Sequence, residues 1–125
     1  MEITIEDLQR RFTEYNRLYF NGKLQMPHFR INKWSCGIYG SYRYDKDGSP
    51  LISIRHNKTT NNNEEELKHT LIHEMLHYYM DRNWFLDLDS AAHLLCWQVM
   101  RIYINLKYGL HIKTYAPKTK KQPKK

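Results

Sequence analysis

Hydrophobic positions near the start of the chain follow a helical period. The apolar side chains recur at three- and four-residue steps, at Ile5, Leu8, Phe12, Tyr15 and Tyr19. This spacing places them on one face of a helix that packs against a core. Thr4, followed closely by acidic residues, suits a helix N-terminus, and Asn21-Gly22 suits its end. The pattern therefore predicts a helix over roughly residues 4–20.

After this helix the pattern changes to a two-residue period, which is typical of strands. Residues 28–34 show this period. Residues 37–44 are rich in tyrosine, a good strand former, and residues 50–55 return as the next strand after a hairpin loop. The loop between the second and third segments contains Gly48, which suits a positive φ in a hairpin. These features predict a small, mostly antiparallel β-sheet.

Two more helices are predicted after a polar linker at residues 59–63. The first begins with three glutamates, which we interpret as charges favourable at a helix N-terminus rather than as metal ligands. It runs to about residue 81. The second covers Ala91 to Lys107 and ends before Gly109. Its apolar positions are Leu94, Leu95, Val99, Ile102, Tyr103 and Leu106. The predicted fold class is therefore α+β.

Composition limits the class of protein. At 125 residues, with 41% hydrophobic and 14% aromatic side chains, the chain suits a single globular domain with a modest core. It contains no apolar run of the length that a membrane span needs. The first residues lack the basic and apolar regions of a signal peptide, so we expect a cytoplasmic protein.

The net charge of +7 is concentrated at one end of the chain. Residues 1–112 hold 14 basic and 13 acidic side chains, whereas residues 113–125 hold six lysines and no acid. We therefore expect a domain at 1–112 and a basic, disordered tail at 113–125. The tail predicts contact with nucleic-acid phosphates, and a merely solubilising terminus is the alternative. The lysines concerned are Lys118, Lys120, Lys121, Lys124 and Lys125.

The strongest chemical signal is His73-Glu74-Met75-Leu76-His77, in the first of the two later helices. Histidines four residues apart lie one turn apart on the same helix face, so both can reach one zinc ion. Glu74 is placed to reach the attacking water, as the general base of a zinc hydrolase does. A histidine-rich helix without a metal is the alternative, but chance gives only about 0.02 occurrences of this motif in such a chain.

A catalytic zinc site needs a third protein ligand. His28 and His56 lie at predicted strand ends, and no spacing argument favours them. His69 precedes His73 by one turn. On a straight helix, residues four apart are rotated by about 40° from one another, so three histidines on successive turns cannot all bind one ion. We therefore place His69 beside the site. His93 lies in the first turn of the next helix, and a helix-loop-helix return can bring it opposite the motif. A polar residue near a helix N-terminus is the alternative reading of His93.

These segments together resemble the SprT-like, or Spartan-type, metalloprotease domain. The resemblance covers roughly residues 8–107 and rests on the motif, on Tyr19-Phe20-Asn21-Gly22-Lys23-Leu24, and on a histidine in the next helix. In that family the third ligand comes from a His-Gly-x-x-Phe segment. Here the segment reads His93-Leu94-Leu95-Cys96-Trp97, so the resemblance implies the metal ligands His73, His77 and His93.

Two departures from the family pattern stand out. Leu94 replaces the glycine of the third-ligand segment, which predicts a different approach of that helix to the site. Bacterial members often carry a zinc ribbon built from cysteines. The only cysteines here, Cys36 and Cys96, are too far apart in sequence to form one.

The resemblance implies a Zn²⁺-dependent peptidase that acts on proteins bound or crosslinked to DNA, with Glu74 as the general base. A tyrosine or histidine near the cleft is expected to stabilise the oxyanion, and ten tyrosines leave that choice open. One alternative is a non-catalytic, zinc-containing nucleic-acid-binding module, although a structural site has no need of Glu74. Another is a peptidase specific for an intracellular regulator.

Overall fold

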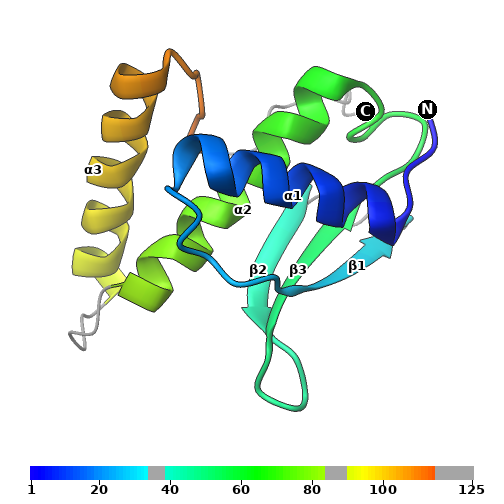
Figure 1. The fold of residues 1–125 in the computed structure, drawn as a ribbon, viewed down its shortest axis with the longest axis horizontal. Coiled ribbons are helices and arrows are strands. Elements are labelled where there is room, and N and C mark those ends of the chain that lie inside the picture. Colours follow the sequence, from blue (N-terminus) through cyan, green and yellow to red (C-terminus); the bar gives the residue numbers. More distant parts are fainter. Residues whose placement is uncertain (34–38, 84–89, 115–125) are drawn as a thin grey trace, which may run out of the picture.

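The computed structural model describes residues 1–33, 39–83 and 90–114, without the side chains of residues 83 and 90–96. In these ranges two helices cover one small sheet, and the last helix stands to the side (Figure 1). The elements in order are α1 (Ile5–Tyr19), β1 (His28–Asn32), β2 (Gly40–Tyr44), β3 (Pro50–Arg55), α2 (Glu64–Asn83) and α3 (Ser90–Tyr108). The predicted α+β class is confirmed.

The sheet is mixed, with β3 in the centre. β2 pairs antiparallel with β3, as expected for strands joined by a short hairpin loop, with Tyr42 opposite Ile52. β1 pairs parallel with the other edge of β3, with His28 opposite Leu51. The predicted antiparallel arrangement therefore holds for β2 and β3 only. No hairpin joins β1 to β3, because the whole of β2 lies between them in the chain.

Local polar contacts fix both ends of α1. Thr4 and Asp7 form a capping box, in which each side chain accepts a hydrogen bond from the backbone N–H of the other. At the other end, the Asn16 amide donates to the Leu24 carbonyl (2.8 Å) and accepts from the Leu24 N–H (3.1 Å). Gly22 lies in this turn with φ +67°. These bonds hold the turn that leads towards β1.

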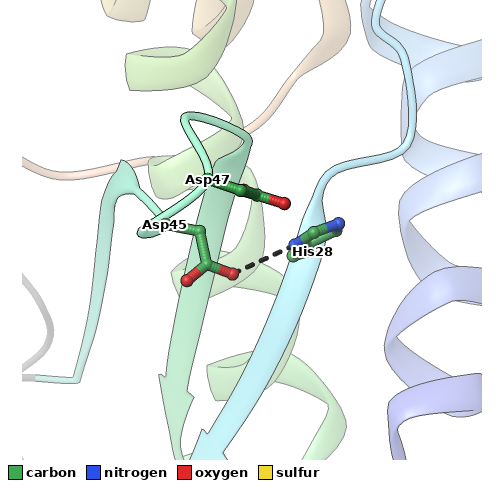
Figure 2. A group of neighbouring side chains, drawn as sticks. All are labelled: His28, Asp45 and Asp47. Atoms are coloured by element: carbon green, nitrogen blue, oxygen red, sulfur yellow. Dashed lines mark hydrogen bonds and ion pairs between the residues drawn. The ribbon is translucent and has the colours of Figure 1, made fainter.

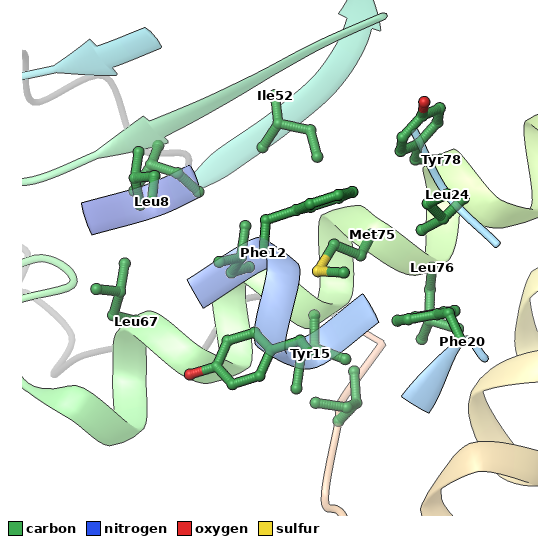
Figure 3. Packing of buried hydrophobic residues seen from close by; sticks show 14 of the residues in the cluster. Leu8, Phe12, Tyr15, Phe20, Leu24, Ile52, Leu67, Met75, Leu76 and Tyr78 are labelled. Carbon is green, nitrogen blue, oxygen red and sulfur yellow. The ribbon is translucent and has the colours of Figure 1, made fainter. Parts of the chain in front are cut away.

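The hydrophobic core lies between α1, α2 and the sheet (Figure 3). Phe12 of α1 contacts the rings of Phe29 in β1 and Tyr78 in α2, at centroid distances of 5.9 and 6.4 Å. α2 contacts β2 and β3 on one side and α3 on another. The other labelled core residues are Leu8, Tyr15, Phe20, Leu24, Ile52, Leu67, Met75 and Leu76. The helix that carries the histidine motif is therefore the central packing element.

α3 buries only part of its apolar surface. Trp97 and Ile104 are buried, and Met100 and Tyr108 are partly buried against the core. The apolar positions on its other side are between 48% and 81% exposed, at Val99, Ile102, Tyr103 and Leu106. A helix with apolar residues around most of its circumference gives no periodic signal for which face is covered.

Three predictions fall partly or wholly outside the described residues. They concern the loop predicted at residues 81–89, of which 84–89 are not described, the strand residues at 34 and 37–38, and the tail predicted at 113–125, of which 115–125 with five lysines are not described. α2 continues to Asn83, two residues beyond its predicted end. None of the described helices is long and apolar enough to cross a membrane.

Candidate functional site

The histidine motif lies in the middle of α2 and faces a cleft. The rings of His73 and His77 lie 5.2 Å apart between centroids, as expected for side chains on successive turns. The cleft has a volume of about 400 Å³. Its lining residues are Gly40 and Tyr42 from β2, and His73, Glu74, His77 and Asp81 from α2. The structure therefore brings the predicted base and two predicted ligands into one cavity.

Trp97 of α3 packs against the rings of His73 and His77. Its ring is 4.8 Å from that of His73 and lies stacked on that of His77 at 4.7 Å. The Trp97 side chain is only 2% exposed. Position 93 precedes Trp97 by one turn of α3, so the two positions share a helix face. The side chain of His93 lies outside the described residues, and its role as a ligand stays a prediction.

His73 is held as a neutral imidazole. Burial, and then the neighbouring His77 and His69, lower its pKa to about 4. Its Nδ1 atom lies 3.2 Å from the Lys113 carbonyl oxygen. A carbonyl can only accept a hydrogen bond, so Nδ1 carries the hydrogen and Nε2 keeps its lone pair. A neutral imidazole with a free lone pair is the form that binds a metal.

Glu74 is buried beside these histidines. Glu74 is 7% exposed, and burial raises the pKa of its carboxyl to about 8. A cation in the cleft would favour the ionised carboxylate and lower this pKa. Glu74 therefore has the environment of a group that exchanges protons near neutral pH.

Gly40 allows β2 and α2 to approach closely at this point. A Cβ atom at position 40 would lie 3.0 Å from the Ser53 carbonyl oxygen and from the Thr70 methyl carbon. It would also lie 3.4 Å from Cγ of Glu74. The absence of a side chain at Gly40 is therefore part of how Glu74 is placed.

Asp81 and Tyr42 also line the cleft, and the sequence alone did not identify them as site residues. The Tyr42 hydroxyl donates to Asp81 Oδ2 at 2.6 Å, and the Tyr44 hydroxyl donates to the same oxygen. Burial, and then the bond to Asp81, raise the pKa of Tyr42. The available signal was spacing, because Asp81 follows His77 by four residues and so lies on the same helix face.

His69 and His56 bind other groups. His69 Nε2 accepts the Lys113 N–H at 2.9 Å, so this nitrogen is occupied by backbone. His56 is buried, and its two ring nitrogens lie 3.0 Å from the carbonyl oxygens of Asn61 and Met1. The ring nitrogens concerned therefore contact backbone groups, for His69 beside the cleft and for His56 away from it.

His28 forms a second cluster, with Asp45 and Asp47 of the β2–β3 loop (Figure 2). Ligand atoms of the three residues lie within 4.8 Å of one another. His28 Nδ1 is 3.1 Å from Asp45 Oδ2 and lowers the pKa of that carboxyl. Asp45 and Asp47 also accept backbone N–H groups of Lys46 and Ser49. These bonds stabilise the hairpin loop, and this structural role is sufficient to explain the cluster.

The donor set in the cleft fits zinc. Two imidazoles on successive helical turns and an adjacent buried carboxylate are the arrangement of a catalytic zinc site. Among the described side chains, none completes a group of three close ligand atoms with His73 and His77. A third ligand from the first turn of α3 is consistent with this finding.

Comparison with known proteins agrees with this arrangement. A search of curated proteins gives no match to this chain. The sequence model of the SprT-like family matches residues 8–116, a range that includes every residue lining the cleft. This family is of the metalloprotease type. The chain therefore belongs to the SprT-like family.

Proposed function

We propose that the protein is a zinc-dependent metallopeptidase that hydrolyses peptide bonds in DNA-associated or DNA-crosslinked proteins. The observation that carries the proposal is the burial of Glu74 in the same cleft as His73 and His77. A non-catalytic site has no need of a buried carboxylate beside its ligands.

His73, His77 and His93 would hold the metal. Zinc, when bound, acts as a Lewis acid that polarises the peptide carbonyl and activates water for attack. The Lys113 carbonyl lies at Nδ1 of His73 and so leaves Nε2 available to bind the metal. Trp97 packs against His73 and His77 and restricts the movement of both rings. The protein thus contributes a rigid and partly dry donor set.

Glu74 would take the proton from the attacking water and deliver it to the amine that leaves. Burial raises the pKa of Glu74. The carboxylate is therefore a better base towards the water, and a carboxyl pKa near the working pH suits a group that both accepts and donates a proton. Among the described tyrosines, Tyr42 lines the cleft. We assign the stabilisation of the oxyanion to its hydroxyl, with Asp81 as its partner in the resting site.

The charge of the chain supports the DNA-related part of the proposal. Lys113 is exposed and its backbone binds His69 and His73, so the basic tail begins beside the cleft. Phosphate contacts made by the lysines that follow would hold the cleft near DNA and weaken as salt rises.

The test is cleavage of a DNA-binding protein, with and without single-stranded DNA, by the zinc-loaded wild type and by Glu74→Gln. We expect cleavage that DNA stimulates and that Glu74→Gln abolishes. A variant with glutamine at Lys118, Lys120, Lys121, Lys124 and Lys125 is expected to lose the stimulation but to keep DNA-independent hydrolysis.

Other outcomes identify the other functions. No cleavage, together with one zinc per chain and tail-dependent DNA binding, would indicate a binding module. Cleavage that is indifferent to DNA would indicate a peptidase for a specific regulator. His93→Ala tests the third ligand. The variant keeps His73 and His77, so we expect it to bind zinc more weakly than the wild type.

A further inference from the structure

A short segment after α3 binds the histidines of α2. α3 ends at Tyr108, and the next residue, Gly109, has a φ of +67° that reverses the chain. Residues 110–113 then run beside α2, and we call them the C-terminal strap. The side chain of Ile112 fixes the strap in the core, where this residue is 4% exposed.

One residue of the strap bridges two turns of α2. The Lys113 N–H donates to His69 Nε2 at 2.9 Å, and the Lys113 carbonyl oxygen lies 3.2 Å from His73 Nδ1. An amide N–H can only donate and a carbonyl can only accept. The strap therefore requires an unprotonated Nε2 in His69 and a hydrogen on Nδ1 of His73. The second requirement leaves Nε2 of His73 free to bind a metal.

The strap is positioned from α3, through Ile112. The Asn105 side chain accepts the Ile112 N–H at 2.9 Å and donates to the Ile112 carbonyl at 3.0 Å. Arg101 also donates to that carbonyl, at 3.0 Å. Without Asn105 the carbonyl keeps one donor, but the Ile112 N–H loses its partner. Asn105 is therefore the residue that fixes the backbone immediately before Lys113.

We infer that Asn105 is a positioning residue, which acts through the C-terminal strap to fix the tautomer and orientation of His73. A backbone carbonyl that receives the second ring N–H is a common support for a metal-binding histidine. This inference rests on the proposed function for the identity of the metal. It adds to the site a residue that does not line the cleft.

The first experiment measures the tautomer of His73 in the metal-free protein, by long-range ¹H–¹⁵N NMR of the imidazole rings. We expect hydrogen on Nδ1 in the wild type. In Asn105→Ala we expect a mixture with the Nε2–H form. Hydrogen on Nε2 in the wild type would overturn the inference, whether or not the protein hydrolyses peptides.

The second experiment measures zinc affinity by competition with a chromophoric chelator. Asn105→Ala should bind zinc about 10- to 100-fold more weakly. Asn105→Asp keeps the acceptor for the Ile112 N–H but loses the donor to the Ile112 carbonyl, so it should recover part of the affinity. Asn62→Ala is the matched control, since it removes one side-chain bond to the Lys58 carbonyl in another loop. It should bind zinc as the wild type does.

The outcomes separate the strap from the proposed function. If Asn105→Ala unfolds at a lower temperature but keeps the tautomer and the zinc affinity, Asn105 is merely structural and the inference is wrong. If Asn105→Ala changes the tautomer but the wild type binds no zinc, the control of His73 by the strap is supported and the proposed function fails.

Discussion

Replacing Gly40 with alanine tests how closely β2 and α2 must approach to place Glu74. The added methyl group would lie 3.0 Å from the Ser53 carbonyl oxygen and from Cγ2 of Thr70. Carbon atoms in contact normally lie about 3.5–4.0 Å apart. The Thr70 side chain on α2 and the backbone of β3 at Ser53 must therefore each move away by several tenths of an ångström.

Overpacking of this kind costs about 1–3 kcal/mol of the free energy of unfolding. For a domain of this size, that cost lowers Tm by roughly 4 °C per kcal/mol. The same shift moves Glu74, whose Cγ lies 3.4 Å from the added group. A misplaced catalytic group loses about 100-fold in rate per ångström, so kcat should fall about tenfold.

The assay combines thermal unfolding, zinc content and peptide hydrolysis for the wild type and Gly40→Ala. Thr70→Ser provides a matched background, because it removes the methyl group but keeps the hydroxyl that donates to Asn61. In that background Gly40→Ala should cost less stability and less activity. If Gly40→Ala has the Tm and kcat of the wild type, the close-approach argument is refuted.

Three further perturbations test other parts of the site. Tyr42→Phe should lower kcat about 100-fold or more at unchanged zinc content, if its hydroxyl stabilises the oxyanion; an unchanged kcat would exclude that role. Asn61→Ala should lower the free energy of unfolding by about 3 kcal/mol in urea titrations, because buried bonds to the Tyr39 and Arg55 carbonyls and from Thr70 are lost. In the metal-free protein, burial raises the pKa of Glu74 from 4.5 to about 8. Folding therefore favours the protonated form, and stability present below pH 4.5 should decline as pH rises towards 8. Glu74→Gln should flatten this decline, and an identical pH dependence in both proteins would contradict it.

Local patterns were sufficient to predict the helices and the central motif. α1 is defined by signals within its own segment, namely the helical spacing of its apolar residues and the Thr4–Asp7 capping box. Its bounds were therefore predictable to within one residue at each end. His73 and His77 share a face because of the helix repeat alone. The distance between their rings needs no tertiary information.

Contacts between distant segments were not predictable. Nothing near β1 indicates that it pairs parallel with β3, because that pairing depends on a crossover past β2. The bond between His73 and Lys113 joins residues 40 positions apart through backbone groups, which every residue type carries. Asp81 accepts hydrogen bonds from Tyr42 and Tyr44 of β2, about 40 residues earlier in the chain, and no local pattern around Asp81 predicts these contacts.

We propose above that His73 and His77 bind a zinc ion that works with Glu74 in hydrolysis. The most direct measurement combines zinc content and peptide hydrolysis for the wild type, Glu74→Gln and His73→Ala, each prepared with one equivalent of zinc. We predict one bound zinc in the wild type and in Glu74→Gln, hydrolysis by the wild type alone, and weak zinc binding by His73→Ala. Hydrolysis by Glu74→Gln at the wild-type rate would show that Glu74 is not the general base, and full zinc binding by His73→Ala would show that His73 is not a ligand.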